Sequence, residues 1–215
     1  PEGTTSGRDI NGFFLTHPNK NYLSLDGVGT YISTSDADLF TFVNGGFSLE
    51  CWFKIANTPP HTKYLIAKTA QDDADTSDNT EYGIFLDTNK KLFFRILDDS
   101  ASAHIGAYWN TALDLNTWYH VVCTHTLGGT TSATCKLYIT TADTIHSAVL
   151  TDVDSESANT YVAMENTTQP LTIGSRSDGI YLFDGLIDDV RVYNRELSLP
   201  EIKKNWKHGS GKHKD

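Results

Sequence analysis

The chain has 215 residues, with 17 Lys and Arg against 27 Asp and Glu, so its formal net charge is −10. An acidic surface of this kind argues against nucleic acid as a partner, because polyphosphates are bound by basic patches. No apolar run approaches the ~20 residues of a membrane-spanning helix, so we expect no membrane insertion. The length suits a single domain with its own hydrophobic core.

Most of the chain consists of short runs in which apolar and polar side chains alternate, which is typical of half-buried β-strands. Residues 1–20 lack this periodicity and are interpreted as an N-terminal arm or lead-in strand. Between the runs lie polar turns with Asp-Gly or Gly-Gly pairs. The expected strands, in chain order, are 22–25, 28–32, 47–54, 64–68, 82–86, 92–96, 118–125, 134–139, 171–175 and 186–193.

The run 47–54 alternates most strictly and shows how such a strand divides its side chains between two faces. One face carries Phe47, Leu49, Cys51 and Phe53, and the opposite face carries Ser48, Glu50, Trp52 and Lys54. About ten short strands with this pattern predict an all-β fold in which two antiparallel sheets pack face to face as a sandwich.

One short helix is expected near the C-terminus. Ser198 can cap its first turn, Pro200 is tolerated there, and Glu201 stands three residues after the cap. The following residues, 207–215, are rich in Gly, Lys and His and are predicted to form a flexible tail. The predicted domain therefore covers residues 21–206, between the arm and the tail.

Four segments, in this order, resemble the laminin-G-like (concanavalin A-like) jelly roll and together span most of the chain. They are 23–27 (Leu-Ser-Leu-Asp-Gly), 47–54, the pair 118–122 and 136–139, and the closing segment 185–198. Thr140-Thr141 departs from the pattern, since such domains often have an Asp-Gly turn there. The resemblance implies two curved sheets and a module that binds sugars, proteins or other surface ligands, often beside calcium. It also implies an extracellular or surface-exposed location, as in secreted, cell-surface and virion proteins. No signal peptide is visible, but the chain starts at Pro1 without Met, so that absence says little.

Asp188 is the candidate calcium ligand. The alternation of 186–193 puts it on the apolar face with Leu186, Val190 and Val192. The resemblance implies that this Asp holds a structural calcium together with the turns at Asp26 and Gly46, which can supply carbonyl oxygens. The alternative is that Asp188 accepts backbone N–H bonds at the edge of the sandwich.

A second acidic segment, 71–81, begins like an EF-hand loop. Its sixth position is Asp78 where the loop needs Gly, and its twelfth is Ile84 where it needs Glu, so the EF-hand interpretation fails. A looser calcium site and a solvated acidic loop remain the alternatives.

Catalytic motifs are missing from the sequence. The glucanase relatives carry their paired carboxylates at alternate positions of one strand, but Glu50 has Trp52 and Lys54 at those positions. Asp154 and Glu156 have the right spacing, yet they stand in a Ser-rich stretch that is interpreted as a loop. We therefore expect no enzyme.

Aromatic side chains supply the candidate ligand contacts. In the hairpin of 82–86 and 92–96, Phe85 is expected opposite Phe93 on the outer face, with Arg95 beside them. Trp52 also lies opposite the apolar face of its strand, while Trp109, Tyr161 and Tyr181 stand in loop-like regions. Exposed rings of this kind would suit a glycan. The alternative is that they pack under loops or against a neighbouring domain.

The three cysteines do not fit a zinc site or a disulfide framework. If the second hairpin turns near Gly129, Cys123 and Cys135 face each other and could form a cross-strand disulfide. The alternative is that both are buried thiols. Cys51 stays unpaired either way.

These observations favour a non-catalytic recognition module that binds carbohydrate or a glycosylated surface, with calcium as a candidate structural cofactor. A structural or protein–protein interaction module of a surface, adhesin or virion protein is the alternative. A glycoside hydrolase-like enzyme comes third.

Overall fold

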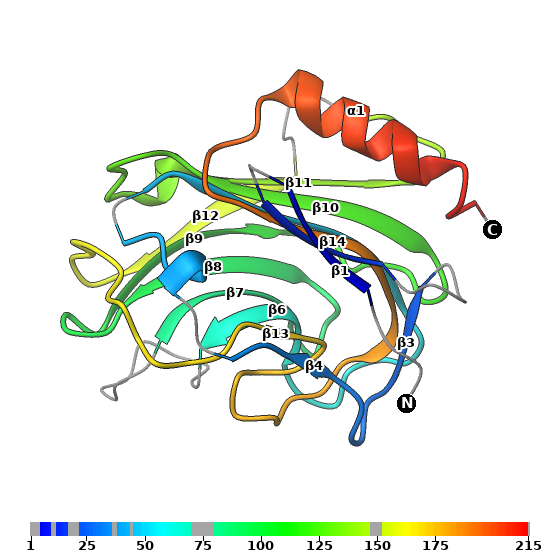
Figure 1. Cartoon of the computed structure of the whole chain (residues 1–215), viewed down its shortest axis with the longest axis horizontal. Coiled ribbons are helices and arrows are strands. Elements are labelled where there is room, and N and C mark those ends of the chain that lie inside the picture. Colours follow the sequence, from blue (N-terminus) through cyan, green and yellow to red (C-terminus); the bar gives the residue numbers. More distant parts are fainter. Residues whose placement is uncertain are drawn as a thin grey trace.

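The computed structural model describes residues 5–9, 12–16, 22–35, 38–43, 45–69, 80–146 and 152–214. Two antiparallel sheets of seven strands pack face to face, and one helix lies outside them (Figure 1). The sheets curve together, with the helix on the convex side. The predicted all-β sandwich with a C-terminal helix is confirmed. Among the described residues, none of the helices has the length and apolar character needed to cross a membrane.

Sheet 1 lies beneath the helix. In spatial order its strands are β1 (Thr5–Asp9), β2 (Gly12–Thr16), β14 (Asp184–Tyr193), β5 (Phe47–Ile55), β10 (Trp118–His125) and β11 (Cys135–Thr141), with β3 (Leu23–Asp26) beside β14. Strand β14 is near the centre of the sheet, since β5 pairs along one of its edges while β2 and β3 share the other edge, one beyond the other.

Sheet 2 is the inner layer of the curve, so its outer face is concave (Figure 1). In spatial order its strands are β12 (Val153–Ala158), β9 (Ala103–Trp109), β8 (Leu92–Asp98), β7 (Thr80–Leu86), β6 (Lys63–Thr69), β13 (Thr172–Ile173) and β4 (Ile32–Ser33). Two short 3-10 turns, η1 (Asp38–Phe40) and η2 (Ser132–Thr134), lie in the connections.

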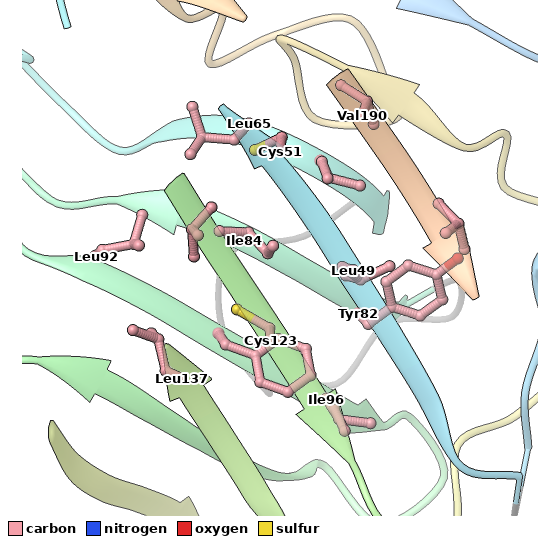
Figure 2. Packing of buried hydrophobic residues seen from close by; sticks show 14 of the residues in the cluster. Leu49, Cys51, Leu65, Tyr82, Ile84, Leu92, Ile96, Cys123, Leu137 and Val190 are labelled. Carbon is pink, nitrogen blue, oxygen red and sulfur yellow. The ribbon is translucent and has the colours of Figure 1, made fainter. Parts of the chain in front are cut away.

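The core fills the space between the two sheets. Figure 2 shows Leu49, Cys51, Cys123 and Leu137 of sheet 1 gathered with side chains of sheet 2, among them Ile84 and Ile96. All four residues of the predicted inner face of β5 are fully buried, as the alternation predicts. Each large apolar side chain removed from water in this way stabilises the fold by about 1.5–3 kcal/mol.

The cysteines contribute to this core as free thiols. The β10–β11 hairpin pairs His125 with Cys135, so Cys123 stands opposite Leu137. The expected facing of Cys123 and Cys135 is therefore wrong, because the hairpin is centred one residue later than assumed. The alternative, buried thiols, is what the structure shows.

Helix α1 (Leu199–Ser210) crosses the outer face of sheet 1 (Figure 1). The predicted cap is confirmed, since the Glu201 carboxylate accepts hydrogen bonds from the Ser198 N–H at 2.9 Å and from its hydroxyl at 2.7 Å. Ile202 is fully buried in a cluster with Val122 and Leu197, which fixes the apolar side of the helix.

The prediction of a flexible tail over 207–215 is wrong for the described part of it. The helix continues to Ser210, and His213 is only 2% exposed. The reason is specific: the His213 ring has stacking and hydrogen-bonding partners on sheet 1, which composition alone cannot show.

A buried polar network links α1 to sheet 1. Glu50 Oε1 lies 3.0 Å from His120 Nε2 and 2.6 Å from Arg191 Nη1, and Asn205 of the helix donates to Glu50 Oε2 at 2.7 Å. Burial raises the pKa of Glu50, but the hydrogen bond and charge of His120, with Arg191, lower it further, so the net pKa lies below the usual value. His120 Nδ1 in turn lies 2.6 Å from His146 Nε2. The helix is thus held by charge-assisted hydrogen bonds as well as by apolar packing.

Candidate functional site

A continuous row of aromatic side chains crosses the concave face of sheet 2. Strand pairing places Tyr64 beside Phe85, Phe85 beside Phe93, and Phe93 beside Tyr108. We call these four residues the aromatic row. Because side chains alternate along each strand, the same strands send Ile84, Leu86 and Phe94 into the core. The predicted pairing of Phe85 with Phe93 on the outer face is confirmed.

The rings of the aromatic row stand side by side. The Phe85 and Phe93 centroids are 5.2 Å apart with planes 5° from parallel, and those of Phe93 and Tyr108 are 5.1 Å apart at 14°. Rings stacked along a sheet cover one another's faces and present their edges to solvent. Tyr64 and Phe85 are buried, whereas Phe93 and Tyr108 are half-buried, so the accessible part of the row is its Phe93–Tyr108 end.

A second row on the same face carries small and charged residues. It runs Ala67, Gly83, Arg95, Gly106 and Glu156, one from each strand. Arg95 donates from Nε to Glu156 Oε1 at 3.0 Å and from Nη2 to Oε2 at 3.2 Å. This fork passes over Gly106, where an added Cβ would lie 3.1 Å from Glu156 Oε1 and would also collide with the Phe94 carbonyl oxygen, so the glycine leaves room for the ion pair to cross β9.

Arg95 joins the two rows, because its guanidinium lies 5.2 Å from the centre of the Phe85 ring. Its side chain is 13% exposed and that of Glu156 is 15% exposed, so the pair is largely withdrawn from water. A bidentate pair in this setting holds both groups in fixed orientations.

At the open end of the aromatic row, Asp154 adds a polar group. Its Oδ2 accepts from Asn110 Nδ2 at 2.7 Å and from the Tyr108 hydroxyl at 3.4 Å. Desolvation, followed by the negative charge of Asp154, raises the pKa of Tyr108, so its hydroxyl remains a donor. Asp154 and Glu156 lie on strand β12, which corrects their expected place in a loop. The Ser-rich sequence concealed this edge strand, whose outer positions are acidic.

Tyr181 is placed near the other end of the aromatic row, in the loop between β13 and β14. Its carbonyl oxygen accepts from the Tyr64 N–H at 3.2 Å, and its ring lies 4.6 Å from the Arg176 guanidinium. The structure therefore gathers Phe85, Phe93, Arg95 and Tyr181 on one face, as candidate contacts from one hairpin and one later loop.

Three other candidate contacts are corrected by burial. Trp52 is fully buried beneath the C-terminal segment, and Tyr161 is 5% exposed in the main core. Trp109 is half-buried and packs against that core from the inner side of β9. For these residues the packing alternative holds, because a helix or the facing sheet covers each ring.

The residues predicted to share one calcium ion are far apart. Asp26 pairs with Asp184 at the start of β14, whereas Gly46 precedes β5 beside the end of β14. The 10 residues of β14 place these ends ~30 Å apart at ~3.3 Å per residue. That ligand set is therefore wrong, and among the described residues no group of three or more His, Cys, Asp and Glu side chains could hold a metal ion. Calcium binding itself stays a prediction.

Asp188 also lies on a different face from the one predicted. The pairing of β14 with β5 shifts register between Asp188 and Arg191, and Asp189 adopts a φ of 49°. This β-bulge breaks the alternation, so Ile187 and Val190 enter the core while Asp188 faces the C-terminal segment. Backbone N–H groups were the alternative partners expected for Asp188, but Asp26 is the residue that binds such groups. Its Oδ1 accepts from three backbone N–H groups of its own turn at 3.0 Å each.

Most of the predicted acidic loop, 71–79, falls outside the described residues. Of its last two residues, Glu81 is fully buried and pairs with Lys68 at 2.6 Å. Burial raises the pKa of Glu81 against the opposing effect of Lys68 and Thr167. Glu81 is therefore part of a buried ion pair, and the EF-hand interpretation remains rejected.

The rim of the sandwich holds a hollow that sequence reasoning missed. A cleft of about 210 Å³ opens beside Asp184, between the turn after β3 and residues 57–60. Asn57 donates to Asp184 at 2.7 Å, and Lys63 lies on the same lining. The pairing of β3 with β14 creates this site, and no local sequence pattern signals it.

Comparisons with known proteins agree with this architecture. The binding domain of botulinum neurotoxin serotype G superposes with a TM-score of 0.59 at 12% identity, over 96% of this chain and 47% of that one. The receptor-binding domain of mosaic serotype C/D gives 0.58 at 15% identity, over 97% and 45%. A Trypanosoma rangeli sialidase gives 0.53 at 20% identity, over 94% and 28%. At these identities the likeness shows a common fold, and the chain spans less than half the length of each of these relatives.

No curated protein sequence matches the chain. The family profile described as the Concanavalin A-like lectin/glucanases superfamily matches residues 26–203, which is most of the chain. The order of strands, the two curved sheets and this match agree, and the protein therefore belongs to the concanavalin A-like lectin/glucanase superfamily.

Proposed function

We propose that the protein is a non-catalytic recognition module that binds carbohydrate or a glycosylated surface on the concave face of sheet 2. One observation carries this proposal: the half-exposed end of the aromatic row, Phe93 and Tyr108, lies between two fixed polar pairs. Apolar ring edges beside oriented hydrogen-bonding groups suit a sugar, which offers both C–H faces and hydroxyls. We further propose that the module acts outside the cell or on a surface.

The fold neighbours support recognition as the general activity, because two of them are toxin domains described as a binding domain and a receptor-binding domain. The sialidase neighbour is an enzyme, but this chain matches only 28% of it. The fold alone therefore does not distinguish a recognition module from an enzyme, and the proposal depends on the side chains of the concave face.

A hydrolase is the second candidate, because β12 places Asp154 and Glu156 at alternate positions on the concave face. A glycosidase needs one of its two carboxyl groups protonated to donate to the leaving oxygen. Here both oxygens of Glu156 already accept hydrogen bonds from Arg95, which fixes the carboxylate against its neighbour on β8. That pairing supports a non-catalytic role.

The test is glycan-array screening followed by calorimetry, with calcium and with a chelator in parallel. Tyr108→Ala should weaken binding about tenfold, since an aromatic contact contributes on the order of 1–1.5 kcal/mol. The matched control is Tyr138→Ala, which removes another half-buried tyrosine, on the outer face of sheet 1 in the cluster with Val122 and Ile202. Loss of affinity in the control but not in Tyr108→Ala would show that the ligand binds somewhere other than the aromatic row.

Failure to bind any glycan under both conditions would favour the protein–protein interaction module instead. Release of reducing sugar that disappears in Glu156→Gln would establish the hydrolase. Binding that a chelator abolishes would support the calcium prediction independently of the sugar site.

A further inference from the structure

The residues that follow α1 turn back onto sheet 1 and bury a histidine. Lys212 N–H donates to the Gly209 carbonyl at 2.8 Å, which closes the turn. Lys212 and Lys214 remain exposed, whereas His213 between them is 2% exposed. Burying a polar ring in a Gly- and Lys-rich segment requires specific partners on the surface that receives it.

Two tryptophans of sheet 1 enclose the His213 ring. The Trp52 ring stacks on it, with centroids 4.5 Å apart and planes 12° from parallel. The Trp118 ring meets it edge-on, also at 4.5 Å, with planes at 61°. Both tryptophans are buried, at 0% and 7% exposure, although they come from different strands, β5 and β10.

Asp188 supplies the charge of this enclosure. Its Oδ2 lies 3.0 Å from His213 Nε2, and the side chain is 7% exposed. The β-bulge in β14 is what directs Asp188 to this face. Asp189, next in the bulge, lies 3.6 Å from Lys212 Nζ and 3.7 Å from Arg191 Nη2, so the flanking lysine is also paired with β14.

The hydrogen bonds define which form of the ring fits. His213 Nδ1 lies 2.8 Å from the Gly209 carbonyl oxygen, and Nε2 faces the Asp188 carboxylate. The Gly209 carbonyl is an acceptor and the Asp188 carboxylate can be one, so an imidazolium, which has an N–H group on each nitrogen, matches both partners. A cation that stacks on the face of Trp52 and lies beside a carboxylate is favoured electrostatically by both groups.

We propose that Trp52, Trp118 and Asp188 form a binding site for an imidazolium group, the imidazolium cage, and that the C-terminal segment is its tethered ligand. The cage lies on the convex face of the molecule, opposite the aromatic row, so it is a second recognition site and does not depend on the proposed function. His213 occupies it in cis, and a free imidazolium can enter when that side chain is removed.

The experiment removes the ring and offers it back in solution. His213→Ala at about pH 6, where free imidazole is largely protonated, should show higher tryptophan fluorescence, because the ring stacked on Trp52 is gone. Imidazole should then restore the wild-type fluorescence and melting temperature in a saturable manner. Wild type and the control His208→Ala, which changes an exposed residue of α1, should show no saturable response.

Thiazole distinguishes this site from a generic cavity, since it has the shape of imidazole but no N–H donor. Restoration by thiazole as well as by imidazole would overturn the proposal, and so would failure of imidazole to bind a folded His213→Ala variant.

A double-mutant cycle tests the same site if His213→Ala does not fold. His213→Phe keeps a ring in the cage but removes both donors, and Asp188→Asn removes the charge. Each change alone should lower the melting temperature. The variant with both changes should melt only slightly lower than either single variant, because both changes break the same interaction. Additive shifts would show that the two residues act independently and would also overturn the proposal.

Discussion

The buried histidine His146 predicts that the protein loses stability between neutral and mildly acidic pH. Its side chain is 2% exposed, and burial, together with the charges of His120 and Lys203, lowers its pKa from 6.5 to about 3. The folded protein thus keeps His146 neutral, while the unfolded chain takes up a proton below its ordinary pKa. Since the unfolded state binds more protons in this range, the free energy of unfolding falls as the pH falls through it.

The size of the effect follows from that shift. Each pKa unit corresponds to 1.36 kcal/mol, so lowering the pH from about 7 to about 5 should remove about 2 kcal/mol of stability through His146 alone. His146→Gln keeps an oxygen that can accept from His120 Nδ1 but cannot titrate. Urea unfolding at both pH values should show the variant losing about 2 kcal/mol less than wild type.

Two comparisons make the result specific. His208→Gln changes an exposed histidine of α1 and should behave as wild type. The pKa of Glu50 is lowered in the folded protein, so its contribution to stability is complete above its unfolded pKa of about 4.3. That contribution is lost only at lower pH, outside the range from about 7 to about 5. Equal losses in wild type and His146→Gln would refute the reasoning.

The remaining predictions concern packing and thiol access. Gly106→Ala should cost about 1–3 kcal/mol of unfolding free energy in urea, because its Cβ meets the Phe94 carbonyl oxygen. Gly29→Ala, whose Cβ meets nothing within 4 Å, should be nearly neutral, and equal costs would show that the close approach is unimportant. Leu49→Ala should cost about 2–5 kcal/mol by the same assay, since the side chain is fully buried between the sheets. Ellman's reagent should label no thiol in the native protein and all 3 cysteines after unfolding. Two fewer labelled thiols in unfolded, non-reduced protein would reveal a disulfide and contradict the free-cysteine assignment.

The sandwich could be predicted because alternation is a local property that burial enforces. The β5 pattern predicts which of its residues enter the core, and the hairpin of β7 and β8 has the predicted register. Strands β9 and β12 were not predicted. β12 lies at a sheet edge and carries serines and acids, so only its pairing with β9 makes it a strand. The run at 28–32 contributes only its last residue to β4.

Within the candidate site, Phe85, Phe93 and Arg95 could be predicted from one hairpin, because cross-strand neighbours follow from the turn. The ion pair of Arg95 with Glu156 could not, since it joins residues 61 positions apart across an intervening strand. Trp52 was misplaced for a related reason. The outward face of β5 is polar in sequence, but α1 and His213 cover it, and alternation within one strand cannot reveal a later segment that docks on it.

The central position of β14 has a consequence for synthesis on the ribosome. Strands β2 and β3 come early in the sequence, but they pair with β14, which runs from Asp184 to Tyr193. Apart from the hairpin of β1 and β2, these early strands have no partner in sheet 1 until β14 has been synthesised. Contacts of such high sequence separation close slowly. The nascent chain must therefore carry unpaired strand edges while the residues between β3 and β14 are synthesised, and the addition of β14 completes sheet 1.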